Sequence, residues 1–173
     1  MPFWSNPRSS PKLSFRWYAS FGFDSLNTIN TYALRSFQKP SFEVATAEYI
    51  WLNDVAYKPG ILSWNPVEIT ITDGEDFSEN NTRKLYNILK GAGYQNTNVN
   101  LPQSAIEKKR ATAALGGAVR LTQINADGNS IETWALENPF ITTVNFGQAN
   151  YGADEIMTIS LGLRYDYATH VIG

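Results

Sequence analysis

A strict alternation of apolar and polar residues between Ile156 and Tyr167 constrains the fold of this chain more than any other feature. Every second residue from Met157 onward is apolar, and the residues between them are small, polar or charged. This period of two predicts a β-strand with one buried face and a fixed pairing register. Twelve alternating residues exceed the roughly five or six of an ordinary strand, so we expect this strand to cross a whole sheet.

Similar alternation recurs along the chain and predicts a mostly β protein. The further strands that we expect are Leu13–Phe21, Tyr32–Lys39, Val67–Thr72, Ala118–Asn125, Ser130–Glu137 and Phe140–Phe146. The segment 125–129 is a strong hairpin turn between two of them. Hairpin connections favour two packed antiparallel sheets that form a sandwich or flattened barrel.

One α-helix is predicted over Glu79–Lys90, beside the sheets. Asp76 or Ser78 would cap its N-terminus, and Gly91 would end it. The pattern of residues 104–117 fits either a short helix or an irregular connection. The predicted fold therefore has one flanking helix.

The segment Phe42–Ala56 predicts a protruding β-hairpin arm, with a turn at Asn53-Asp54. Its return strand is expected to include Tyr49, Ile50, Trp51 and Leu52, and a Pro59-Gly60 corner leads to the next strand. Four consecutive large apolar residues cannot all face one side of a strand, and a lone hairpin cannot cover both sides. We interpret the segment as an arm that packs on another subunit; the alternative is a central core strand.

The length of 173 residues fits a single domain, residues 1–173. Residues 1–12 hold three prolines, which predicts an extended N-terminal arm that Phe3 and Trp4 could anchor on a neighbour. Residues 168–173 are expected to be a C-terminal tail. The candidate inter-subunit contact residues are Phe3, Trp4, Tyr49, Ile50, Trp51 and Leu52.

The composition excludes several classes of protein. A net charge of −2 and a pI near 5.4 argue against a tight grip on nucleic acid, which needs clustered Lys and Arg. The absence of cysteine excludes disulfides and thiolate metal sites. Without an apolar run of about 20 residues or an apolar signal core, we expect no membrane anchor and synthesis in a reducing cytoplasm.

No set of residues predicts catalysis or a cofactor. The single histidine, His170, is expected to be a solvated tail residue. The acidic segment 73–76 lacks the spacing of a calcium loop and fits a turn beside a helix N-terminus. Glu68 and Glu132 form an imaginable glycosidase pair but lack an aromatic sugar platform. We therefore expect a protein that is not an enzyme and binds neither a cofactor nor a metal.

The ordered set of these features resembles the tail tube proteins of contractile-tailed bacteriophages, a family related to type VI secretion tube proteins. An early strand, Lys39-Pro40, a hairpin arm and the segment Trp64–Ile71 are followed by an acidic turn and the single helix. The step Leu136–Ile141 and a closing strand that ends in Leu-x-Tyr-Asp-Tyr complete the set. The resemblance covers residues 13–167 and leaves out the N-terminal arm and the Asn-rich loop after Gly93.

The resemblance implies a structural virion protein of the phage tail, assembled in the host cytoplasm. Copies would polymerise as stacked homohexameric rings into the hollow inner tube, and their inner sheets would join into one β-barrel. The implied partners are the tail sheath protein, the baseplate or tube initiator, and the tail terminator. Double-stranded DNA would pass through without specific binding, and a mildly acidic wall would let it slide.

Three other interpretations stay open at this point. The chain could be the tube protein of a related contractile machine, such as type VI secretion or a tailocin. It could be a tube initiator, terminator or baseplate subunit with the same fold. It could also be a carbohydrate-binding β-sandwich, with sugars stacked on Trp17, Trp51, Trp64 or Trp134.

Overall fold

The computed structural model describes residues 16–21, 29, 33–76, 80–94, 106–152 and 155–172. Within these residues the chain forms mostly strands, with two helices, α1 (Asn81–Ala92) and α2 (Lys108–Ala114). The strands are β1 (Trp17–Ser20), β2 (Leu34–Phe37), β3 (Phe42–Trp51), β4 (Asp54–Trp64), β5 (Val67–Thr72), β6 (Ala118–Ile124), β7 (Ser130–Glu137), β8 (Phe140–Asn145), β9 (Thr158–Arg164) and β10 (Tyr167–Ile172).

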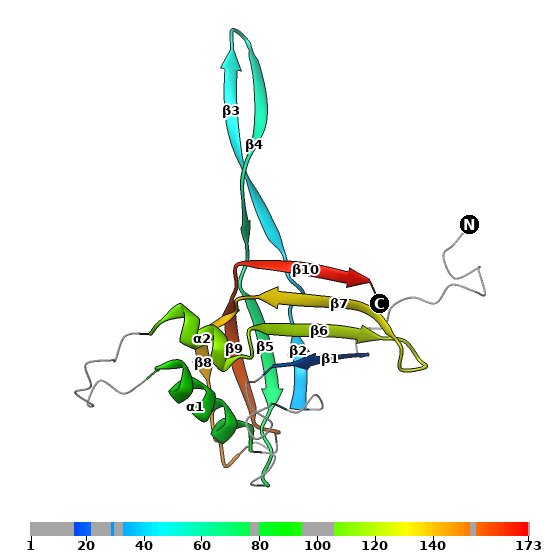
Figure 1. Ribbon diagram of the computed structural model, residues 1–173, viewed down its shortest axis with the longest axis vertical. Helices are drawn as coiled ribbons and strands as arrows, with labels where there is room; N and C mark the ends of the chain where they lie inside the picture. Colours follow the sequence, from blue (N-terminus) through cyan, green and yellow to red (C-terminus); the bar gives the residue numbers. More distant parts are fainter. Residues whose placement is uncertain are drawn as a thin grey trace.

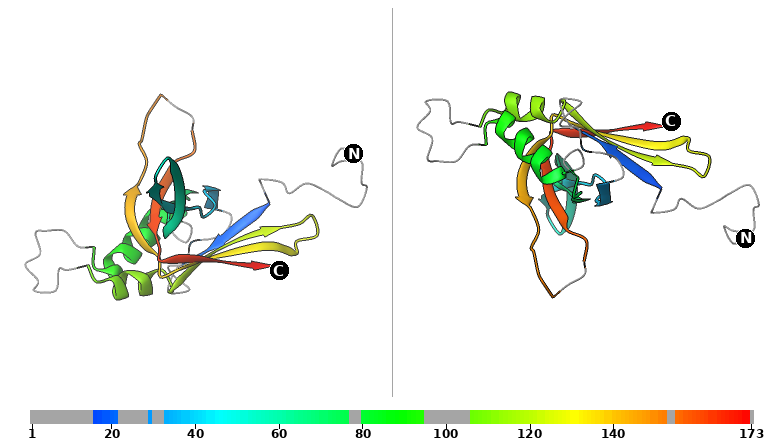
Figure 2. Two further views of the ribbon diagram at one scale, coloured as in Figure 1. Left: turned by 90° about the horizontal axis from the view of Figure 1, so that it is seen from above. Right: turned by 90° about the horizontal axis from the view of Figure 1, so that it is seen from below.

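Two four-stranded antiparallel sheets form the body of the protein. The first sheet has the order β1-β6-β7-β10, and the second has the order β2-β5-β9-β8. Figure 1 shows the strands of the first sheet running across those of the second, with the helices beside β8. The views from above and below in Figure 2 agree with this crosswise packing. The predicted pair of packed antiparallel sheets is confirmed; they pack as a sandwich, and neither closes into a barrel within the described residues.

The core lies between the sheets and the helices. Every second residue of β5 and β9 faces it, as the alternation predicts, and Ile69 is 0% exposed. The first sheet contributes Val119, Leu121 and Leu136, and α1 contributes Leu85 and Ile88, to the same cluster. Because the sheets and both helices share one cluster, the body folds as one unit around it.

The long C-terminal strand predicted from Ile156 to Tyr167 is instead two strands in different sheets. β9 ends at Arg164 and pairs in the second sheet, and β10 pairs with β7 in the first. Tyr165 at the corner is still buried in the core, whereas Tyr167, the last apolar residue of the alternation, is 48% exposed. The predicted tail at residues 168–173 was wrong for the same reason, since β10 runs to Ile172.

Asp166 fastens the corner between β9 and β10 to its surroundings. Its carboxylate accepts hydrogen bonds from Lys108 Nζ at 2.5 Å and from Asn138 Nδ2 at 3.1 Å. The hydrogen bond from Lys108, and to a smaller extent the one from Asn138, lowers the pKa of Asp166 below its ordinary value. Slight burial acts in the opposite direction but has a smaller effect. The corner is thereby tied to the first turn of α2.

The structure has two helices where the sequence predicted one, because residues 108–114 form the short helix α2. α1 begins and ends two residues later than expected. The Asn80 side chain, not Asp76 or Ser78, accepts from Arg83 N at 2.7 Å, and Gly93 with φ of 94° ends the helix in place of Gly91. Neither described helix is long and apolar enough to cross a membrane.

The acidic turn before α1 stabilises the N-terminus of this helix. The Asp73 carboxylate accepts hydrogen bonds from the backbone N–H of Asn81 at 2.8 Å and of Thr82 at 3.1 Å. A negative charge at this position also offsets the positive end of the helix dipole. The expectation of a turn beside a helix N-terminus is therefore confirmed.

Replacing Ile69 with alanine tests the position of the core. We expect Ile69→Ala to lower the free energy of unfolding by about 2–5 kcal/mol, because it leaves a cavity between the packed layers. Glu68→Ala, on the solvent face of the same strand, is the control and is expected to change it by less than about 0.5 kcal/mol. Urea unfolding monitored by tryptophan fluorescence measures both; equal effects would contradict the assigned register.

Candidate functional site: an exposed hairpin arm

The β3–β4 hairpin projects from the body along the longest axis of the molecule (Figure 1). Its two strands pair with each other from Phe42 opposite Trp64 to Trp51 opposite Asp54, and with no other described strand. All residues of β3, and all of β4 except Trp64, are exposed. The predicted protruding arm is confirmed, and the alternative of a central core strand is wrong.

The arm is longer than predicted, and its turn lies one residue earlier. Trp51 pairs with Asp54, so Leu52 and Asn53 form the turn. Tyr49, Ile50 and Trp51 therefore end the outgoing strand and do not belong to the return. The expected corner at Pro59-Gly60 lies inside β4, which continues to Trp64.

Pro59 and Gly60 mark a β-bulge instead of a corner. Val44 pairs with Leu62 and Thr46 pairs with Pro59, so Gly60 and Ile61 together oppose Ala45. A Cβ atom on Gly60 would lie 2.9 Å from the Ala45 carbonyl oxygen, which explains glycine here. A bulge interrupts the hydrogen-bond ladder and therefore tolerates proline, which lacks a backbone donor.

The register divides the arm into two faces, because directly opposed residues share a face. One face is mostly apolar, and we call it the apolar face; its large residues are Phe42, Val44, Ile50, Val55, Tyr57 and Leu62, and it also carries Thr46 and Glu48. The other, the mixed face, carries Glu43, Asp54 and Lys58 among alanines, and also Tyr49 and Trp51. The Lys58 ammonium lies 5.2 Å from the centre of the Tyr49 ring on this face.

The arm exposes more apolar surface than a solitary protein usually tolerates. Leu52 at the turn is 87% exposed, and Ile61 at the bulge is 83% exposed. With the large residues of both faces, the arm presents on the order of 1,000 Å² of apolar side chain, against roughly 300–600 Å² for the largest patch of a typical monomer. Summed over both faces and the turn, that area is of the same order as the roughly 800 Å² that each partner contributes to a stable protein interface.

The structure brings four of the six predicted contact residues together. Tyr49, Ile50, Trp51 and Leu52 lie at the tip of the arm, whereas Phe3 and Trp4 lie outside the described residues. The sequence missed the remaining apolar residues of the arm because Pro59-Gly60 was interpreted as the end of the hairpin. Their signal was the alternation of Val55, Tyr57 and Leu62 around the bulge.

Three of the four tryptophans proposed as sugar platforms have aromatic neighbours, whereas Trp51 is 64% exposed at the tip of the arm. Trp17 packs edge-on against Phe37 at 4.3 Å between ring centres, and Trp64 packs against Phe42 at 5.2 Å. Trp134 lies 4.7 Å from the ring of His170. His170 is exposed, as predicted, but it belongs to β10, so the prediction that it lies in a tail was wrong.

Glu132 is a buried acid whose hydrogen-bond partners hold elements of the fold together. Its side chain is 9% exposed and accepts hydrogen bonds from Lys39 Nζ, at 3.0 Å, and from Trp134 Nε1. Glu68 lies on the solvent face of β5, in the other sheet, so the imagined glycosidase pair does not form. No group of three or more His, Asp or Glu side chains in the described part is placed to hold a metal ion.

The fold of the chain is that of components of contractile injection systems. A chain of the anti-feeding prophage (AFP) baseplate, a six-fold symmetrised cryo-EM structure, matches with a TM-score of 0.68 and 14% identity over 94% of this chain and 97% of that one. A chain of the sheath-tube complex of the extracellular contractile injection system PVC, in the extended state, has a TM-score of 0.68 and 15% identity over 96% and 95%.

A chain of the PVC sheath/tube terminator, also in the extended state, has a TM-score of 0.68 and 16% identity over 95% of this chain and 99% of that one. No protein-family model and no curated protein matches the sequence. At these identities the likeness establishes the fold. None of the three structures is described as that of an enzyme, and the resemblance to tail tube proteins is confirmed at the level of the fold.

The stability of the subunit should not depend on the tip of the arm. We expect Ile50→Ser to change the free energy of unfolding of dissociated subunits by less than about 0.5 kcal/mol, because Ile50 is 68% exposed and contacts no core cluster. Urea unfolding at low protein concentration measures it, with Leu121→Ser in the core as the destabilised control. A large loss of stability in Ile50→Ser would mean that the arm folds back onto its own body.

Proposed function

We propose that this chain is a structural subunit that polymerises into the hollow inner tube of a contractile injection machine, as stacked rings of six copies. The observation that carries the proposal is the arm, whose apolar area is of the size of one side of a stable interface and which no described residue of the chain covers. The six-fold symmetrised baseplate with the same fold supports the number six. Phe3, Trp4 and Tyr49–Leu52 remain the proposed contact residues.

The edges of the first sheet support ring closure. β1 pairs only with β6, and β10 pairs only with β7, among the described strands. By contrast, β8 at the edge of the second sheet lies against α2, and Tyr94 donates a hydrogen bond to the Ile141 carbonyl there. Joining β1 of one copy to β10 of the next is a head-to-tail contact, and such contacts close into rings. A closed ring of sheets leaves no open edge.

The outer face of the first sheet would then line the channel. This face carries hydroxyl side chains, including Ser20, Thr133 and Thr169, and the opposite charges of Arg120 and Glu137. It also carries three exposed apolar side chains, Tyr18, Tyr167 and Val171. The wall would be non-adhesive because it is nearly uncharged, which differs from the phosphate-repelling wall that the pI alone suggested. An uncharged wall of this kind allows passage of a cargo without binding it.

The machine that we favour from the sequence is a contractile phage tail, in which the tube conducts double-stranded DNA and binds sheath, baseplate initiator and terminator. Assembly in the host cytoplasm and residence in the virion follow from that proposal. The second candidate is the tube of an extracellular contractile injection system, which the similarity to the PVC sheath-tube complex favours. Nucleic acid inside purified particles would decide for the phage tail.

Electron microscopy of the purified full-length chain tests the proposed function. We expect hollow tubes of uniform diameter, formed without another protein. Tyr57→Ser on the apolar face should raise the critical concentration for assembly more than tenfold, since losing about 100 Å² of buried apolar surface costs about 2.5 kcal/mol. Lys58→Gln, the adjacent residue on the mixed face, is the control with a smaller effect. Wild-type protein that stays monomeric at high concentration would refute the proposal.

A further inference from the structure

Two short connections join the β3–β4 arm to the body, and we call them together the joint. β2 leads into β3 through residues 38–41, and β4 leads into β5 through residues 65–66. The registers of the body pair β2–β5 and of the arm pair β3–β4 place Pro40 of the first connection at the same level as Pro66 of the second. Proline has no backbone N–H, so neither residue can donate a hydrogen bond to the other connection.

Backbone hydrogen bonds flank the level of the two prolines on both sides. On the body side, Gln38 N donates to the Glu68 carbonyl at 3.0 Å. On the arm side, Asn65 N donates to the Ser41 carbonyl at 2.9 Å. Hinges in proteins are formed by a few residues at the ends of strands or helices, where the regular hydrogen-bond ladder stops. The joint therefore marks the place where the arm can turn relative to the body.

Lys39, inside the joint, connects it to the first sheet. Its Nζ atom donates hydrogen bonds to the Glu132 carboxylate of β7 at 3.0 Å and to Gln123 Oε1 of β6 at 3.4 Å. The Glu132 side chain is 9% exposed; it also accepts from Trp134 Nε1 and lies 3.9 Å from His170 Nε2. A buried carboxylate is costly to leave without a cation, so this ion pair is held more firmly than one between two exposed side chains.

Trp64 holds the arm to the body next to the joint. It is the one residue of the two arm strands that is not exposed, and its ring centre lies 5.2 Å from that of Phe42 and 6.0 Å from that of Tyr165. Aromatic contacts act over a range of about 4.5–7 Å and in several geometries. A charged hydrogen bond is more restrictive in its distance. The Lys39–Glu132 ion pair is therefore the contact that specifies a direction for the arm.

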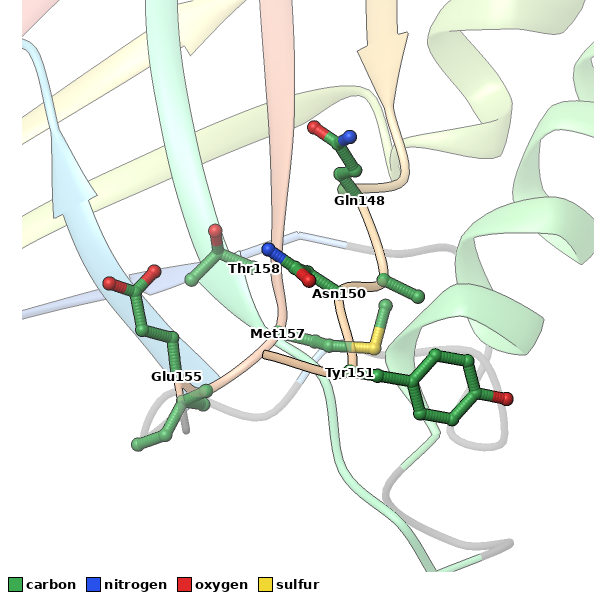
Figure 3. A pocket seen from close by; sticks show the side chains of 9 residues that line it. Gln148, Asn150, Tyr151, Glu155, Met157 and Thr158 are labelled. Atoms are coloured by element: carbon green, nitrogen blue, oxygen red, sulfur yellow. The ribbon is translucent and has the colours of Figure 1, made fainter. Parts of the chain in front are cut away.

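The connection between β8 and β9 also projects from the body but has no comparable attachment. Figure 3 shows Tyr151 and Glu155 of this connection pointing in different directions. The Asn150 side chain accepts a hydrogen bond from Gly152 N, only two residues away, at 3.0 Å. Among the described residues, no ion pair ties this connection to another element. The ion pair at the joint is thus a feature of the arm and not of projecting segments in general.

We propose that the joint at Pro40 and Pro66 allows the arm to turn, and that the Lys39–Glu132 ion pair fixes one direction before the subunit associates. Lys39 is then a positioning residue, because the direction of the arm decides where its apolar face is presented. A subunit whose arm is already oriented loses less conformational freedom on association. The consequence for assembly rests on the proposed function, whereas the fixed direction is a property of the single subunit.

Distances between pairs of spin labels, measured on dissociated full-length chains, test the role of the ion pair. The chain contains no cysteine, so labels attach only to introduced ones, here Tyr57→Cys on the arm and Tyr86→Cys on α1, two exposed positions. We expect a narrow distance distribution when Lys39 is present. In Lys39→Met, which keeps the length of the side chain but removes its charge, the distribution should become roughly twice as wide, because the joint is then free to turn.

Three controls accompany this measurement. Lys39→Arg keeps the charge and should restore the narrow distribution. Lys109→Met makes the same chemical change on α2, away from the joint, and should leave the distribution narrow. A second label pair within the body, at Tyr86 and at Asp127 in the β6–β7 turn, should give the same distribution with and without Lys39. If Lys39→Met does not fold, Glu132→Gln, which preserves the shape of the side chain, takes its place.

The unlabelled variants test the consequence for assembly. The apparent affinity of subunits falls in proportion to the fraction whose arm points in the competent direction. We therefore expect Lys39→Met to raise the critical concentration for tube assembly about threefold, the result for an arm that is correctly oriented one third of the time. Lys39→Arg and Lys109→Met should assemble close to the wild-type level. Sedimentation of assembled tubes at a series of protein concentrations measures all three.

The outcomes distinguish this inference from the proposed function. Equal widths in wild-type and Lys39→Met chains would overturn the role of the ion pair and leave the tube proposal standing. Equal widening of the body label pair would overturn it as well, since it would show a general loss of structure. A wider arm distribution with an unchanged critical concentration would overturn the link to assembly. Wild-type chains that form no tubes would refute the proposed function alone. Widening confined to the arm, and reversed by Lys39→Arg, would support the inference.

Discussion

The uncovered apolar area of the β3–β4 arm is the constraint on which the rest of the interpretation depends. A two-stranded hairpin has no third layer, so it cannot bury either face by itself, and isolated hairpins are at best marginally stable in water. This arm is ten and eleven residues long in its two strands, and every side chain except Trp64 is exposed. Its hydrophobic side chains become stabilising only when another surface covers them.

The body therefore stabilises the folded subunit, whereas the arm is available for association. The body buries one cluster between two sheets and two helices, and its polar contacts, such as Lys39 with Glu132 and Lys108 with Asp166, fasten elements that are distant in sequence. These interactions fix the subunit. The arm contributes little to that cluster, so the free energy of burying its apolar side chains is gained only when subunits associate. The same residues therefore weaken the monomer and strengthen the assembly.

The sequence predicted the parts of the fold that depend on local periodicity. Val67–Thr72 alternates and is flanked by polar turns, so its strand and buried face were both predicted correctly. The corner at Tyr165 and Asp166 escaped because a period of two continues across it, and nothing local shows that the chain changes sheets. The sequence Pro59-Gly60 led to the opposite error, because these residues usually end a strand. Only the pairing with β3, in which Gly60 and Ile61 together oppose Ala45, shows that they belong to a bulge within one strand. The tip residues were identified as contact candidates from their apolar run.

The arm also needs protection before assembly, since an exposed apolar hairpin with two open edges can pair with other chains. Glu43, Glu48 and Asp54 lie along its strands, against Lys58 as the only basic residue. An arm with this excess of acid repels a second arm placed beside it in register. The bulge at Gly60 adds a local twist, which further opposes flat edge-to-edge pairing. Burial against a differently shaped surface avoids this repulsion. The charges thus disfavour arm-to-arm aggregation and leave arm-to-body contact as the favourable way to cover the apolar face.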